Sequence, residues 1–215
     1  MQRRVLRRLV CAVAVSSPVA AVASPAFEQG ELECKHIPDH AFEVAELGHA
    51  EAQAQLGRLL VEGYCGESTN AYVEGVHWLE AASAQGHVDA AVLVGALLDD
   101  GVVFPPDRIR AAKHYGRAAE AGHPAAQHRL GMLLVTGDAG AQDTELGMYW
   151  LGAAANHGDA IAAAALGLMH ARGLHGVEQD VCLALDWYEA SELLDVPFSV
   201  QALREELPLA QKDRC

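Results

Sequence analysis

Basic side chains are scarce in this chain of 215 residues, which has 15 Lys and Arg against 29 Asp and Glu and a formal net charge of -14. Four of the arginines fall within the first eight residues, and no other cluster of Lys or Arg follows. Because binding to a phosphate backbone needs a basic surface, this composition argues against nucleic acid as a partner. Aromatic residues are also few, at 6%, yet 51% of the residues are apolar. The chain can therefore bury a core of mostly small and aliphatic side chains.

The motifs that mark common reactions and cofactor sites are absent. The chain has no Cys-x-x-Cys, His-Glu-x-x-His, Ser-x-x-Lys, Gly-x-Ser-x-Gly or Gly-x-x-x-x-Gly-Lys. His49, His87 and His123 stand in equivalent positions of successive segments, so a repeated turn or cap role explains them better than a shared metal ion. The sequence predicts no catalytic residues, no metal and no cofactor, and a protein that is not an enzyme.

Residues 1–23 have the pattern of a secretory signal peptide. The early arginines precede an apolar run over 9–15 and a small-residue stretch that ends at Ala23. The run is interrupted at Ser16 and is far shorter than the roughly 20 apolar residues of a membrane span. We expect cleavage after Ala23, no membrane span after cleavage, and a location in the bacterial periplasm. Secretion from the cell and a eukaryotic secretory location are the alternatives.

Glycines recur with a fixed period through the middle of the chain. Four of them open successive segments, and each is followed by a glycine nine residues later and by another fifteen residues later. Four residues after each opening glycine stands an alanine, and eight residues after it stands Leu or Val, so the two positions share one helical face. The glycine at offset fifteen follows this helix. The opening glycines are Gly48, Gly86, Gly122 and Gly158. Such a period indicates helix pairs that stack upon one another.

Each segment is predicted to hold two helices. The first runs from about three residues after the opening glycine to the glycine at offset fifteen, which is a good helix terminator. Asp107, Asp143 and Asp180 are expected to cap the second helix in three segments, and Asn70 stands nearby in the first segment. The second helices then combine one large residue with small ones, as in Trp150 followed by three alanines.

The fourth segment shows the full pattern. It reads Ala164-Ala165-Leu166-Gly167, then Gly173-Leu174-His175-Gly176-Val177-Glu178-Gln179-Asp180, then Ala184-Leu185-Asp186-Trp187-Tyr188-Glu189-Ala190. This pattern resembles the Sel1-like repeat, which is related to the tetratricopeptide repeat. The resemblance implies an all-α fold, a right-handed superhelical solenoid of about four helix-turn-helix repeats with capping helices, and a role as an adaptor.

The expected organisation divides the chain into a leader, two caps and the repeats. A lone helix is expected over 39–47, and a truncated first helix over 197–206. The parts are a signal peptide over 1–23, an N-terminal cap over 24–47, four repeats over 48–194 (48–85, 86–121, 122–157 and 158–194) and a C-terminal capping helix over 195–215.

Four cysteines remain after cleavage, and export to an oxidising compartment favours disulfides. The end repeats of a four-layer stack lie about 30 Å apart if adjacent layers are about 10 Å apart, whereas a disulfide needs Cα atoms within about 7 Å. Of the three possible pairings, the solenoid allows only Cys34–Cys65 with Cys182–Cys215. Each bond is predicted to fasten a terminal segment to the end repeat.

The face of the first helices opposite the core is expected to line a concave groove that binds a partner. An apolar strip rimmed by charge suits a peptide or protein ligand. Ordinary packing between repeats explains Leu93, Met132 and Leu168 equally well on periodicity alone. The predicted groove residues are Glu51, Gln55, Arg58 and Glu62, then Asp89, Leu93, Ala96 and Asp100, then Arg129, Met132 and Thr136, then Leu168 and Arg172.

These features favour a non-enzymatic periplasmic or secreted scaffold that binds another protein or peptide of the cell envelope. Envelope complex assembly, sensor regulation, a motor or secretion accessory role and host interaction all remain open, because nothing in the sequence chooses among them. The alternative is a binder or hydrolase of a cell-wall-related small molecule, since some cysteine-rich relatives of the Sel1-like family are associated with β-lactams. A deep pocket with converging polar groups would favour this alternative.

Overall fold

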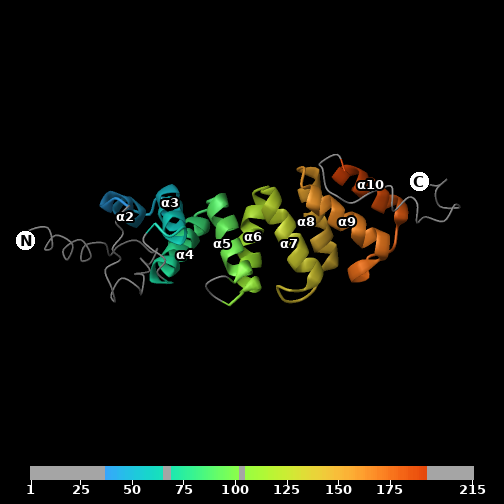
Figure 1. The fold of residues 1–215 in the computed structure, drawn as a ribbon, viewed down its shortest axis with the longest axis horizontal. Helices are drawn as coiled ribbons and strands as arrows, with labels where there is room; N and C mark the ends of the chain where they lie inside the picture. The colour runs from blue at the N-terminus through green and yellow to red at the C-terminus, as the bar shows by residue number, and fades with distance from the viewer. Residues whose placement is uncertain (1–36, 65–68, 102–104, 193–215) are drawn as a thin grey trace, which may run out of the picture. The chain divides into compact units, whose positions relative to one another are not determined.

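α-Helices follow one another along the chain with short connections. The computed structural model describes residues 37–64, 69–101 and 105–192, and within them it holds nine α-helices, one 3-10 turn and no β-strand (Figure 1). The elements are α2 (Asp39–Glu46), α3 (Ala50–Val61), α4 (Thr69–Ala84), α5 (Val88–Asp100), α6 (Arg108–Glu120), α7 (Pro124–Thr136), α8 (Thr144–Asn156), α9 (Ala160–Arg172), η2 (Leu174–Gly176) and α10 (Val181–Glu192).

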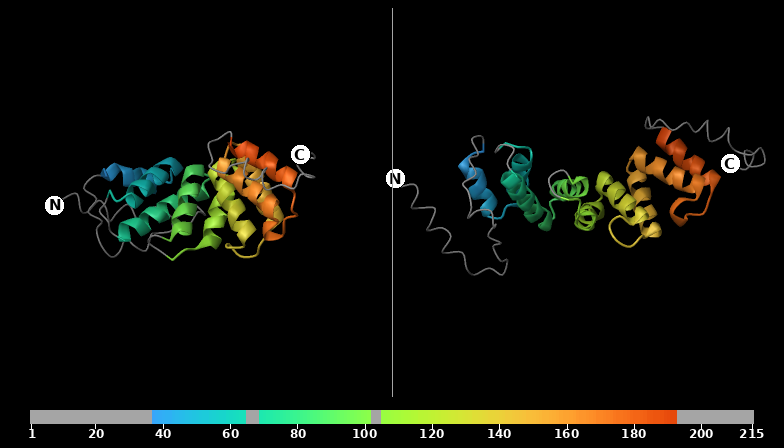
Figure 2. Two further views of the ribbon diagram at one scale, coloured as in Figure 1. Left: turned by 45° about the vertical axis from the view of Figure 1, so that its right-hand side comes forward. Right: turned by 60° about the horizontal axis from the view of Figure 1, so that its bottom comes forward.

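Packing in this part of the chain is sequential. Each helix from α3 to α9 contacts the helix before it and the helix after it, as the two views of Figure 2 show. We call α3, α5, α7 and α9 the first helices of the repeats and α4, α6, α8 and α10 the second helices. The fold is therefore an all-α solenoid, in which each pair covers the apolar face of its neighbour.

Aspartates cap the second helices as the sequence predicts. Asp107, Asp143 and Asp180 each accept a hydrogen bond from the backbone N–H three residues later, at 3.0 Å. Each bond satisfies a donor that the first turn of a helix leaves unpaired. The first repeat differs, because α4 already begins at Thr69 and Asn70 lies inside the helix rather than at its cap.

Histidines occupy the corresponding position at the start of the first helices. The Nδ1 atoms of His87 and His123 accept hydrogen bonds from the backbone N–H three residues later, at 3.2 and 3.4 Å. His49 holds the N-cap position of α3 without such a bond, and Asp159 takes the position in α9. The predicted cap role is thus confirmed for His87 and His123.

Glycines set both ends of the first helices. Gly101, Gly137 and Gly173 follow α5, α7 and α9 with φ of 64°, 77° and 65°, a left-handed conformation that terminates a helix without steric strain. The four opening glycines have almost the same φ, between 87° and 88°, in the turn before each first helix. The glycines that open the segments and those that end the first helices therefore recur because the same turns recur in each repeat.

The interior is built mostly from alanine, leucine and valine. One cluster of buried residues extends from Ala54 on α3 to Leu133 on α7, and a second runs from Val135 on α7 to Met169 on α9. In each second helix, the largest buried side chain belongs to the residue that directly follows the tryptophan or histidine of that helix. These residues are Leu79, Tyr115, Leu151 and Tyr188.

These bulky residues press against the glycine inside each first helix. A Cβ atom on Gly131 would lie 2.8 Å from the carbonyl oxygen of Gly147 and 3.0 Å from the backbone nitrogen of Leu151. A Cβ atom on Gly95 would lie 2.6 Å from the ring of Tyr115. Helix propensity favours alanine over glycine by about 1 kcal/mol, so close packing explains the glycines.

The repeats alternate in the way that they make this contact. In repeats one and three, a second glycine in the second helix (Gly75, Gly147) brings the two backbones together beneath a leucine. In repeats two and four, the ring of Tyr115 or Tyr188 lies over the glycine of the first helix.

A buried glutamine follows the same alternation. The Nε2 atom of Gln53 donates to the carbonyl of Ala45, and that of Gln127 donates to the carbonyl of Ala119. Each glutamine oxygen also accepts a hydrogen bond from the next turn, from Gln85 in the first case and His157 in the second. Repeats two and four have alanine at this position instead, and both alanines are buried.

Several predictions about the ends of the chain lie outside the described residues. These are the signal peptide, residues 24–36 of the N-terminal cap, the helix over 197–206, and Cys34, Cys65 and Cys215. The lone helix expected over 39–47 is present as α2. Among the described residues, no helix is both long enough and apolar enough to cross a bilayer.

Candidate interaction surface

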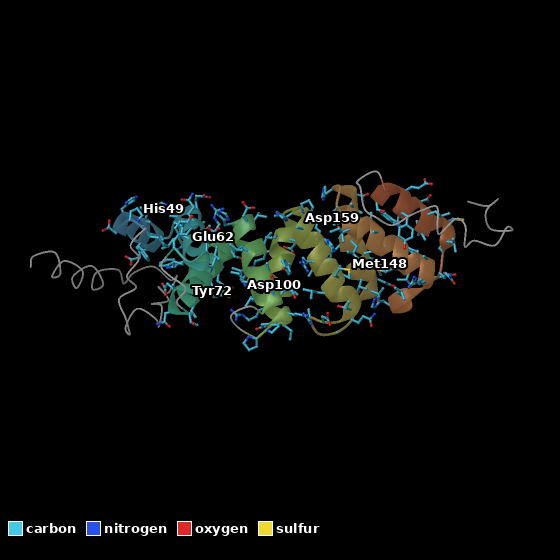
Figure 3. The ribbon with its side chains drawn as sticks, viewed as in Figure 1. His49, Glu62, Tyr72, Asp100, Met148 and Asp159 are labelled. Carbon is cyan, nitrogen blue, oxygen red and sulfur yellow. The ribbon has the colours of Figure 1, made fainter. Side chains whose placement is uncertain are left out.

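The first helices carry a row of exposed polar side chains, which we call the A-face. Figure 3 labels two of its members, Glu62 and Asp100. Most of the predicted groove residues lie on this row and are exposed. These are Glu51, Gln55, Arg58, Glu62, Asp89, Asp100, Arg129, Thr136 and Arg172.

The apolar residues predicted for the groove have a different environment. Leu93 is half-buried and packs against the cluster of α3 to α7, Met132 packs against the cluster of α7 to α9, and Leu168 packs against α10. Ala96 is also half-buried. The contacts of the three larger residues are those of the packing alternative, and the exposed part of the A-face is mostly polar.

Glu51 links the first two repeats. Its carboxylate accepts hydrogen bonds from Nε2 of His87 at 3.0 Å and from Nε2 of Gln55 at 2.6 Å. The hydrogen bond from His87 is the main reason that the pKa of Glu51 is lowered. Because Nδ1 of His87 accepts the cap bond of α5, Nε2 is the ring nitrogen that donates to Glu51.

Asp99 joins the second repeat to the third, and sequence reasoning missed it. Its side chain is 11% exposed and contacts Arg108 at 3.2 Å and Arg129 at 4.0 Å. Arg108 also lies 3.8 Å from Asp138. The pairing is not visible in the sequence, because Asp99 belongs to no local motif and its partners are 9 and 30 residues away.

Two buried tyrosines lie close to the arginines of the A-face. Burial raises the pKa of Tyr115 to about 12, with Asp99 adding to the effect and Arg129 opposing it. Burial also raises the pKa of Tyr188, and Arg172 opposes that shift. Neither tyrosine is therefore ionised near neutral pH, and neither is suited to act as a base.

A second feature lies between α8, η2 and the start of α10. It is a cleft of about 750 Å³ whose lining residues include Asp143, Glu145, Glu178 and Asp180, and we call it the acidic cleft. Met148, which Figure 3 labels on α8, is among its apolar lining residues. No sequence motif predicts this cleft. The turn that forms one of its walls contains His175 in a left-handed conformation with φ of 55°.

The described part of the chain offers no cluster of three or more His, Cys, Asp or Glu side chains that could hold a metal ion. Cys182 lies in the first turn of α10 and is disulfide-bonded. The other cysteines are outside the described residues, so the pairing of Cys182 with Cys215 stays a prediction.

Comparison with known proteins identifies the repeat. The model of the Sel1 repeat matches residues 50–87, 88–123, 124–159 and 160–194. The chain belongs to the Sel1-repeat family. The matched units begin close to the first residues of α3, α5, α7 and α9, two residues after the opening glycines.

Two solved structures show the same fold as this Sel1-repeat protein. The protective antigen c5321 of uropathogenic Escherichia coli, which displays the SLR fold, is 26% identical with a TM-score of 0.64 and is aligned over 73% of this chain and 33% of its own. A Sel1 repeat protein from Oxalobacter formigenes is 25% identical with a TM-score of 0.61 and is aligned over 78% and 67%. This chain thus spans one third of the first protein. A search of curated proteins finds no match.

Sel1 repeats generally serve as scaffolds for interactions between proteins, and the family is typically non-catalytic. The described part of this Sel1-repeat protein therefore presents two surfaces of interest. One is the polar A-face, and the other is the acidic cleft on the second helices of the last two repeats.

Proposed function

We propose that this protein is an exported, non-enzymatic scaffold that binds another envelope protein along the A-face. The observation that carries the proposal is the distribution of charge on the exposed row. On α3 and α5 the carboxylates of the row outnumber its single guanidinium, that of Arg58, which lies 3.7 Å from Glu62. On α7 and α9 the charged members of the row are Arg129 and Arg172. A surface that changes sign along its length fixes both the position and the direction of a polypeptide with the complementary pattern.

Membership of the Sel1-repeat family and the side-chain chemistry of the A-face both support a binding role. The A-face has carboxylates and guanidinium groups, but the pKa shifts near it belong to Glu51, which is paired with His87, and to tyrosines that stay protonated. No residue of the set combines a nucleophile with a base, so the geometry suits recognition.

The direct test is affinity capture from an envelope extract with the wild-type protein and the Arg129→Glu/Arg172→Glu variant. We expect a partner that the wild type retains and the variant loses, because two reversed charges oppose the partner's carboxylates. Binding is then measured with the purified partner, and cross-linking followed by peptide mapping locates it on α7 and α9.

A matched control separates the A-face from overall charge. Lys113 and Arg117 are exposed on α6, a second helix, so Lys113→Glu/Arg117→Glu makes the same change of charge on the other layer. This control should keep the partner. If both variants bind as well as the wild type, or if both lose the partner equally, the A-face is not the binding surface.

We further propose a periplasmic location with two disulfides, Cys34–Cys65 and Cys182–Cys215. The signal-peptide pattern of residues 1–23 and the bonded state of Cys182 support this proposal. Non-reducing peptide mapping of the exported protein should find both bonds. A Cys34–Cys215 or Cys65–Cys182 bond would contradict it, since each would join opposite ends of the stack.

A further inference from the structure

The A-face carries charges of opposite sign that the chain itself leaves largely unpaired. Asp89, in the first turn of α5, and Arg172, at the end of α9, make no ion pair with any residue that the structure describes. Within the same ranges Arg129 has one ionic contact, at 4.0 Å from Asp99, and its side chain is 59% exposed. These groups can therefore meet opposite charges on another molecule without first giving up strong interactions of their own.

The opposite charges stand at matching levels of the first helices. Glu62 and Arg172 each lie fourteen residues after the opening glycine of their repeat, where the first helix ends. Asp89 lies three residues and Arg129 seven residues after theirs, so the two levels differ by about one helical turn. Glu62 is 3.7 Å from Arg58, but both side chains are exposed, and such a pair is weak. Each acidic position on α3 and α5 thus has a basic counterpart on α7 or α9.

A surface with this pattern is complementary to a second copy of itself in one orientation. Two identical faces meet about a two-fold axis, and the same residues then serve on both sides. An axis along the row of first helices would place α3 on α3 and bring like charges together. An axis across the row, parallel to the first helices, places α3 opposite α9 and α5 opposite α7 and keeps every residue at its own level. Glu62 then faces Arg172 of the second copy, and Asp89 lies about one turn from Arg129 of the second copy.

The size of the A-face makes such a dimer weak. The four first helices span about 30 Å if adjacent layers are about 10 Å apart, and the eleven residues between the outermost levels of the row span about 16 Å of helix. The contact would cover about 500 Å² of each copy, which is less than the roughly 800 Å² per partner of a stable complex. The net charge of -14 adds repulsion between copies. A contact of this kind forms and separates readily, so it leaves the surface open to a competitor.

We propose that the A-face of one copy pairs with the A-face of a second copy about a two-fold axis across the row, and that the envelope partner displaces this weak dimer. The second copy is the occupant because its A-face presents the charges in the reversed order that the first copy needs. The inference rests on the proposed function, in which the A-face binds a partner, and it adds a means of regulating that surface. Self-association and partner binding exclude each other, since both use the same charged side chains.

The test is sedimentation equilibrium of the exported protein and of two charge-reversed variants. We expect the mean mass of the wild type to rise from monomer toward dimer between about 1 μM and 1 mM, the range of a weak complex. Arg129→Glu/Arg172→Glu makes both halves of the row acidic, and Glu62→Arg/Asp89→Arg makes both halves basic. Each variant alone should therefore dimerise at least about tenfold more weakly than the wild type. An equimolar mixture of the two variants should recover the dimer to within about threefold of the wild type, because each reversed charge meets its reversed counterpart.

Net charge does not account for the expected pattern. Glu62→Arg/Asp89→Arg lowers the net negative charge of the protein, yet it should dimerise less than the wild type. Lys113→Glu/Arg117→Glu changes the net charge as much as the reversal of the two A-face arginines does, but on α6, and it should dimerise like the wild type. All of the substituted side chains are exposed, and circular dichroism of each variant verifies its fold.

The outcomes separate this inference from the proposed function. A wild type that stays monomeric, or a mixture of variants that stays monomeric, would overturn the dimer, and capture of an envelope partner by such a monomer would leave the proposed function intact. Single variants that dimerise like the wild type would place the contact on another surface and would overturn the inference as well. A dimer that shows the charge exchange but captures no envelope partner would support the inference and contradict the proposed function.

Discussion

Gly131→Ala tests whether the glycines inside the first helices are there for packing. The new Cβ atom would lie 2.8 Å from the carbonyl oxygen of Gly147, 2.8 Å from Cγ of Leu151 and 3.0 Å from the nitrogen of Leu151. Two of these three atoms belong to the backbone of α8 and have no rotamer that moves them away. The helices α7 and α8 would therefore have to separate.

The expected effect is the difference between two opposing terms. Alanine favours the helix over glycine by about 1 kcal/mol, whereas overpacking of a core costs about 1–3 kcal/mol and more when rigid groups collide. Because the collision here is with backbone, we expect a net loss of about 2 kcal/mol in the free energy of unfolding. For a chain of this size, the loss corresponds to a fall of about 4–8 °C in Tm.

The assay is urea unfolding followed by circular dichroism, with Gly152→Ala and Gly116→Ala as matched controls. Both control glycines are inside second helices, and a Cβ atom on either would meet nothing within 4 Å. They gain the propensity of alanine without a collision, so they should be as stable as the wild type or more stable. A Gly131→Ala variant that unfolds at the same urea concentration as these controls would refute the packing explanation.

Three further perturbations follow from the buried polar groups and the caps. Burial lowers the pKa of His114 from 6.5, so on acidification the unfolded state binds a proton before the folded state does. The free energy of unfolding should therefore fall as the pH drops below about 6.5. In the His114→Phe variant, the urea midpoint should depend less steeply on pH. Gln127→Ala removes one buried and one part-buried hydrogen bond and should cost about 1–3 kcal/mol. Gln55→Ala on the exposed face should cost far less in the same urea titration. Asp143→Ala removes the cap of α8 and should lower the free energy of unfolding by about 1 kcal/mol, and a loss under a few tenths would show that the cap is dispensable.

The periodic features of the fold were predictable because each depends on local geometry. The opening glycines, the terminating glycines and the cap residues Asp107, Asp143 and Asp180 act on residues within one turn of themselves. Asn70, which stands near the cap position in the first segment, lies inside α4, because spacing alone does not locate the start of that helix.

The surface was less accessible to sequence reasoning. Periodicity gave the exposed positions of Glu51, Arg129 and Arg172, but it could not tell whether Leu93 faces solvent or a neighbouring repeat, since both alternatives have the same spacing. The contact of Asp99 with Arg108 and the acidic cleft depend on how one repeat meets the next. Such contacts are set by the stacking of whole helices.

The alternation of odd and even repeats constrains how a solenoid of this kind can be lengthened. A copied third repeat would place two odd units side by side. His128 would then face the histidine cap of the copy, equivalent to His123, in place of Asp159, whose carboxylate now lies 3.1 Å from Nδ1 of His128. A copy of two consecutive repeats keeps every such partner in place. In-frame duplication or engineered extension should therefore succeed in steps of two repeats. The structural unit that can be copied is a pair of repeats, not a single helix hairpin.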